Sequence, residues 1–118
     1  ESLDPEEKKR GPDAAQLLGL AVLSCLSASF IYCLNKRELT IKDLDGKAEI
    51  FFKKNERGYI RIDKIDILII PKTDDPEILK RINQCIKKLK SGKMFFEETC
   101  IITPSVEKGI KVNVKVDL

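Results

Sequence analysis

Residues 14–34 read AAQLLGLAVLSCLSASFIYCL, without one charged side chain. Apolar residues surround the whole helical circumference instead of forming one stripe, which is typical of a helix buried on all sides or of one that spans a bilayer. Asp13 is placed to cap the first free amides, and Lys36 and Arg37 suit the negative end of the helix dipole. These ends fit both interpretations, and the choice between them decides the function.

Length and composition narrow the classes of function. The 118 residues fit a single domain, residues 1–118, with residues 1–12 as a polar N-terminal arm. Charged residues make up 35% of the chain but leave a net charge of only +3, too small to indicate nucleic acid or an anionic membrane as partner. Histidine is absent, which excludes His-based acid–base catalysis, a Ser-His triad and His metal sites. We expect no metal and no organic cofactor.

Four cysteines, Cys25, Cys33, Cys85 and Cys100, carry the remaining chemistry. None forms a CxxC pair, which argues against a zinc ribbon or a thioredoxin motif. Cys25 and Cys33 are about 12 Å apart along a helix axis, beyond the roughly 7 Å that a disulfide allows between Cα atoms. With no secretory signal ahead of them, the cysteines are expected to be reduced thiols in a cytoplasmic protein, with Cys33 and Cys85 packed in the core.

The middle of the chain has the patterns of a hairpin and a second helix. After a turn at Asp45-Gly46, residues 47–54 and 59–71 alternate as two strands around a Gly-containing connection at residues 55–58, with a bulge near Asp63 and Lys64. A helix is expected to start at Pro76 and to run with one apolar stripe as far as Ser91-Gly92.

The C-terminal part contains the clearest strand pattern in the chain. Residues 94–99 form a short amphipathic piece that leads to Cys100, and residues 103–105 are expected to turn. Residues 109–118 then alternate strictly, which predicts a strand with five side chains facing inward: Ile110, Val112, Val114, Val116 and Leu118. The order of elements predicts an α+β domain in which an antiparallel sheet packs around the long helix.

Two stretches resemble the OsmC/Ohr family of thiol peroxidases. GPDAAQLLGLAVLSC at residues 11–25 is similar to the family's Pro-rich entry and Leu/Ala-rich helix that ends in a cysteine. ETCIITPSVEKGIKVNVKV at residues 98–116 is similar to the family's cysteine, short turn, glycine and alternating strand. With the strand pair and amphipathic helix between them, the resemblance covers residues 11–118.

The resemblance implies both a fold and a reaction. The fold would be an intertwined cytoplasmic homodimer with the two long helices packed centrally. Cys25 would be the peroxidatic thiol and Cys100 the resolving thiol, and an external thiol reductant would reset their disulfide. An apolar surround would favour organic hydroperoxides over hydrogen peroxide, because it buries an alkyl group at about 25 cal/mol per Å².

The chain departs from the family at two functional positions. Active members carry a Glu in the first turn of the long helix, where this chain has Ala15, and an Arg from an N-terminal strand, which these residues either lack or do not show. Arg10 is a candidate substitute cation, although it also fits a solvated basic run. Burial without a cation would raise the pKa of Cys25 and leave its thiol inert.

Two other classes of function therefore stay open. One is an OsmC-like dimer that has lost its activity and binds a small apolar ligand. The other is a single-span membrane protein with a small soluble α+β domain, in which residues 14–34 would cross the bilayer. Its basic flanks at residues 8–10 and 36–37 are nearly symmetric and specify no topology.

Overall fold

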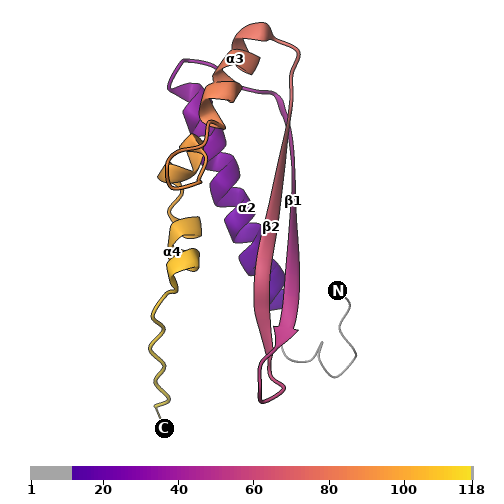
Figure 1. Cartoon of the computed structure of the whole chain (residues 1–118), viewed down its shortest axis with the longest axis vertical. Helices are drawn as coiled ribbons and strands as arrows, with labels where there is room; N and C mark the ends of the chain where they lie inside the picture. The colour runs from indigo at the N-terminus through magenta and orange to yellow at the C-terminus, as the bar shows by residue number, and fades with distance from the viewer. Residues whose placement is uncertain (1–11, 118) are drawn as a thin grey trace.

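The computed structural model describes residues 12–117, and residues 1–11 of the predicted arm, Arg10 included, lie outside the described residues. The described chain is elongated, 55 × 31 × 29 Å. A long helix, α2 (Pro12–Asn35), contacts every other named element, with a β-hairpin along one side and the C-terminal helical segments along another (Figure 1). The prediction of an α+β chain built around a long helix is confirmed.

One face of α2 carries the core. Val22, Leu26, Phe30 and Leu34 follow each other at four-residue spacing and are all buried. Asp13 lies in the first turn, not at the cap as predicted, because the helix begins at Pro12. The opposite face is open, and Leu17 is 66% exposed. The prediction of burial on all sides is therefore wrong for one copy of the chain, since no element within residues 12–117 covers this face.

The hairpin consists of β1 (Asp43–Lys54) and β2 (Ile60–Lys72), paired antiparallel. Phe51 pairs with Lys64 and Phe52 with Ile62, which leaves Asp63 as the extra residue of a bulge where the alternation predicted one. Three partly buried side chains of β2 pack against the core: Ile65, Ile67 and Ile69.

Two glycines allow α2 and the hairpin to approach closely. A Cβ atom on Gly46 would lie 2.8 Å from Cδ1 of Leu23, and one on Gly19 would lie 2.7 Å from Cδ1 of Ile50. Gly46 was predicted to turn the chain with Asp45, but both residues lie inside β1. At this position glycine provides room for a helix side chain, and the dipeptide pattern does not distinguish that use from a turn.

The second helix, α3 (Pro76–Cys85), starts where predicted and ends earlier. Asp75 caps it by accepting hydrogen bonds from the amides of Glu77 and Ile78. The chain then turns back on itself through a bridge between Lys88 and Met94 and continues as the 3-10 helix η1 (Phe95–Thr99).

The turn predicted at residues 103–105 is wrong, because a short helix, α4 (Ile102–Lys108), occupies it. Pro104 is compatible with that helix, since proline is tolerated in a first turn, where its missing N–H has no helical partner.

The C-terminal segment does not join the sheet. Among residues 12–117 the sheet has two strands, and residues 109–117 run on from α4 without a strand partner (Figure 1). Val114 is 84% exposed and Ile110 is 61% exposed. The predicted inward face is therefore wrong for one copy of the chain, and Leu118 lies outside the described residues. Alternation indicates a strand with one apolar face but does not say which chain covers it.

Candidate functional site

The structure brings Cys25 and Cys100 together. Cys25 lies in the middle of α2, and Cys100 follows η1 directly. Their Sγ atoms are 2.8 Å apart, against about 2.05 Å in a disulfide bond. The distance between the two sulfurs therefore has to shorten by less than about 1 Å for a disulfide to form. Cys25 is partly exposed, whereas Cys100 is buried.

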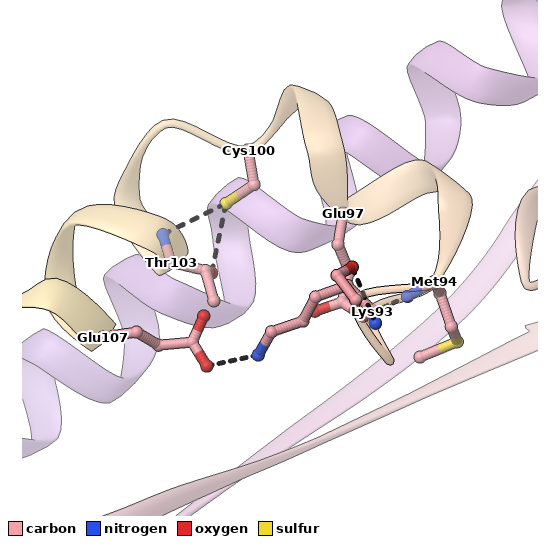
Figure 2. A network of polar contacts seen from close by, with 7 residues as sticks. Lys93, Met94, Glu97, Cys100, Thr103 and Glu107 are labelled. Carbon is pink, nitrogen blue, oxygen red and sulfur yellow. Dashed lines mark hydrogen bonds and ion pairs between the residues drawn. The ribbon is translucent and has the colours of Figure 1, made fainter. Parts of the chain in front are cut away.

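Aromatic packing holds Cys100 against α2. Phe96 of η1 is buried, and its ring meets the ring of Phe30 edge to face, with centroids 5.3 Å apart and planes at 87°. The amide of Cys100 donates to the Glu97 carbonyl at 3.1 Å, which ends η1. At the start of η1, the Met94 amide donates to Oε2 of Glu97 at 2.8 Å (Figure 2).

Thr103 contacts the sulfur of Cys100 from the first turn of α4. Its amide donates to Sγ at 3.4 Å, and its Oγ1 lies 3.2 Å from the same sulfur (Figure 2). Lys93 and Glu107 form an ion pair beside this turn and join the loop before η1 to α4. Cys100 is thus fixed from both sides, by Phe96 before it and by Thr103 after it.

Hydrogen bonds set the acidity of Cys25. Burial raises the pKa of this thiol. Hydrogen bonds from the Cys100 thiol and from the backbone at Ile102 and Ile101 lower the pKa, and together they outweigh burial, so the pKa lies below its ordinary value. The prediction that a thiol without a neighbouring cation has a raised pKa is therefore wrong here. Its premise considered only α2, whereas these donors come from the segment that contains Cys100.

The other two cysteines form a disulfide. Cys33, in the last turn of α2, is bonded to Cys85, the last residue of α3. Both are buried, as the core prediction required, but the prediction that all four cysteines are reduced is wrong. No sequence pattern indicated this pairing, since 52 positions separate the two residues. Nε of Arg81 donates to the Cys33 carbonyl at 2.9 Å, a second link between the two helices.

A cleft of about 540 Å³ opens beside the thiol pair. One wall is formed by α2 and another by β2, with six apolar lining residues: Leu18, Val22, Leu26, Ile62, Ile65 and Ile67. Asp63 and Lys64 of β2 add two charged side chains to the second wall. A third wall is formed by η1, α4 and the loop before η1, where Lys93, Glu97, Thr103 and Glu107 provide polar groups. Neither cysteine lines this cleft, but Thr103 both lines it and contacts the sulfur of Cys100, so the cleft and Cys100 are one side chain apart.

The family resemblance named both cysteines of the pair, but no sequence pattern indicated the groups around them. Thr103 was expected only to form part of a turn. The available signal was its position three residues after Cys100, because a side chain just before a helix often accepts a hydrogen bond from an amide two or three residues later. Ala15, where the resembling family has a Glu, lies in the first turns of α2, and Arg10 lies outside the described residues.

Two further features bear on the class of protein. Within residues 12–117, Asp13–Asn35 is the one helix long and apolar enough to cross a membrane, a test that the core helix of a soluble protein also passes. The same described residues contain no cluster of three or more His, Cys, Asp or Glu side chains placed to hold a metal ion. Comparison of the chain with protein-family models, curated proteins and solved structures finds no match.

Proposed function

We propose that this chain is an OsmC-like, thiol-dependent peroxidase that reduces organic hydroperoxides, with Cys25 as the attacking thiol and Cys100 as the resolving thiol. The observation that carries the proposal is the 2.8 Å separation of the two sulfur atoms, which come from segments 75 positions apart in the sequence. A structural role in the core would not require two free thiols to face each other at this distance.

The reaction has two steps. The Cys25 thiolate attacks the terminal oxygen of the hydroperoxide, the O–O bond breaks, and the alkoxide takes a proton and leaves as an alcohol. Cys25 is now a sulfenic acid. The Cys100 sulfur then attacks the Cys25 sulfur, forms a disulfide and releases water. A thiol reductant supplies two electrons and two protons by exchange and returns both cysteines to thiols.

Exposure and acidity support this division of roles. Cys25 is the more exposed of the two thiols, and its pKa is lowered by donors on the segment of Cys100. Peroxide must reach the attacking sulfur from solvent, and the thiolate is the reactive form. The resolving sulfur has only to reach Cys25, so burial does not hinder Cys100.

The cleft supports an organic substrate. Its volume, about 540 Å³, lies within the usual range for small-molecule sites of about 300–1,000 Å³. Val22 and Leu26 of α2 form an apolar wall that would bind an alkyl group. Thr103, which contacts the Cys100 sulfur, lines the same cleft, so the peroxide group would lie toward the Thr103 side. Hydrogen peroxide would gain nothing from this wall.

The proposed assembly is a homodimer, as the resemblance to OsmC/Ohr implies. The open face of α2 consists of small and apolar side chains, with Ala21, Ser24 and Ala28 between Leu17 and Tyr32. Residues 109–117 carry a second exposed apolar row. A second copy would cover both surfaces, because each is too apolar to be a typical solvent-exposed surface.

One observation favours a second candidate function, binding of a small apolar ligand without catalysis. Ala15 occupies the position of the family's Glu, and the cleft would remain usable without peroxide chemistry. The membrane interpretation receives less support, because α2 contacts the hairpin, α3, η1 and α4, and such contacts need protein along the helix where lipid would otherwise lie.

An activity assay separates the candidates. Purified protein with a dithiol reductant should consume cumene hydroperoxide faster than hydrogen peroxide, and Cys25→Ser should abolish the consumption. Cys33→Ser is the matched control on the same helix and should keep the initial burst of one peroxide per chain. Binding of a medium-chain fatty acid without any consumption of peroxide would favour the ligand-binding candidate, and a requirement for detergent would favour the membrane protein.

A further inference from the structure

The disulfide and the free thiol pair lie at the two ends of one segment. The chain leaves α3 at Cys85, turns back, and returns as η1 to reach Cys100. Its first end is bonded to Cys33 of α2, and its last end contacts Cys25 of the same helix. The disulfide therefore anchors to α2 the segment that delivers Cys100.

Short-range contacts make the position of η1 depend on that anchor. The Phe95 amide donates to the Lys87 carbonyl at 2.9 Å, and the Leu89 amide donates to the Lys93 carbonyl at 2.8 Å. The first residue of η1 is thus hydrogen-bonded to Lys87, two residues after Cys85. A shift at Cys85 would be passed to η1 through this small folded unit, with the Phe30–Phe96 contact as the opposing restraint.

We propose that the Cys33–Cys85 disulfide positions Cys100 for the second step of the reaction, so that its reduction slows closure of the Cys25–Cys100 bond and prolongs the Cys25 sulfenic acid. This inference rests on the proposed peroxidase function. A misplacement of about 1 Å can slow an intramolecular step by about a hundredfold. Because Phe96 still holds η1 after reduction, the expected loss is smaller, on the order of tenfold.

Formation of the anchor is a two-electron oxidation. The thiols of Cys33 and Cys85 lose two protons and two electrons to a disulfide oxidant such as oxidised glutathione, which becomes two thiols. A dithiol reductant reverses the step. Cys33 is 3% exposed and Cys85 is fully buried, whereas Cys25 is partly exposed. A mild reductant therefore reaches the working pair before the anchor, and the anchor persists through catalytic cycles.

The experiment compares three forms of the full-length chain. The first is wild type with Cys33–Cys85 intact and the other two thiols reduced, the second is wild type with all four thiols reduced, and the third is C33A/C85A. Peptide mapping by mass spectrometry establishes each state before use. Quenched-flow samples taken after one equivalent of cumene hydroperoxide are then divided between dimedone, which traps sulfenic acid, and non-reducing mapping of the Cys25–Cys100 disulfide.

The two steps give separate readouts. Each form is measured at a pH above its own Cys25 alkylation midpoint, so that donors on the Cys100 segment no longer change the fraction of thiolate. Under that condition the rate of loss of the Cys25 thiol should agree within about twofold among the three forms. Disulfide closure should be about tenfold slower in the two forms without the anchor, with more dimedone adduct on Cys25. If circular dichroism shows that C33A/C85A does not fold, the reduced wild type provides the same comparison.

The outcomes distinguish this inference from the function on which it rests. Equal closure rates in all three forms would overturn the positioning role while leaving the peroxidase intact. A change in the rate of Cys25 thiol loss with no change in closure would also overturn it, because the anchor would then act on the first step. If Cys25 of the anchored wild type does not oxidise, both proposals fall.

Discussion

Replacement of Phe96 by leucine tests how Cys100 is held. Phe96 is 5% exposed and meets Phe30, 2% exposed, edge to face at 5.3 Å. Such a pair contributes about 0.5–1.5 kcal/mol beyond its buried area. Adding the small void that leucine leaves, F96L should lower the free energy of unfolding by about 1–2 kcal/mol. For a chain of this length the melting temperature should fall by about 5–10 °C.

The assay is urea unfolding followed by circular dichroism, at one protein concentration and with the Cys33–Cys85 disulfide intact. A double-mutant cycle with F30L isolates the ring contact: the two changes together should cost about 0.5–1.5 kcal/mol less than the sum of the single changes. Additive effects within about 0.3 kcal/mol would refute the reasoning, because the rings would then not interact energetically. F51L, on a ring of the hairpin outside this contact, is the matched control.

Three further predictions follow from individual contacts. D75A should lower the free energy of unfolding by about 0.5–2 kcal/mol in the same urea assay, because it removes the cap of α3. The control D74A should change the free energy of unfolding by less than about 0.5 kcal/mol, and equal effects would contradict the role of Asp75 as the cap. The pH midpoint of iodoacetamide alkylation at Cys25 should lie below that of an ordinary thiol. C100A should raise this midpoint and so slow alkylation at pH 7, whereas an unchanged midpoint would exclude the hydrogen bond from Cys100 as the cause. V114K should shift the assembly from dimer toward monomer in analytical ultracentrifugation, whereas K115V on the opposite side of the extended segment should not; a monomeric wild type would contradict the proposed dimer.

Local patterns were sufficient for much of the fold. The uncharged residues 14–34, the break in alternation at Asp63 and the start of α3 at Pro76 each depend on neighbours in sequence, and the structure confirms all three. The resemblance to the OsmC/Ohr family assigned paired roles to cysteines on two separate segments. The structure brings these two sulfurs together, while the roles themselves stay a prediction.

Contacts between distant segments account for most of what sequence patterns did not predict. The partner of Cys33 is set by how α3 packs on α2, so spacing along the chain carries no information about Cys85. The lowered pKa of Cys25 has the same origin, since its donors arrive with the segment around Cys100. Gly46 was wrongly predicted to form a turn, because the reason for glycine there is the room it leaves for the side chain of Leu23, a residue of another element.

The C-terminal segment shows a different limit. Strict alternation over residues 109–118 predicted an inward face, yet no element within residues 12–117 covers the side chains of Ile110, Val112, Val114 and Val116. Alternation reports the chemistry of a strand's two faces and carries no information on whether the covering surface belongs to the same chain.

The most direct test of the central claim is chemical mapping of the two thiols after one exposure to peroxide. Reduced wild type treated with one equivalent of cumene hydroperoxide should yield a Cys25–Cys100 disulfide, and C100S should instead accumulate a dimedone-reactive sulfenic acid at Cys25, while C25S yields neither. Hydrogen peroxide at the same concentration should produce the disulfide more slowly. A Cys25 thiol that stays reduced under excess organic hydroperoxide would contradict the account.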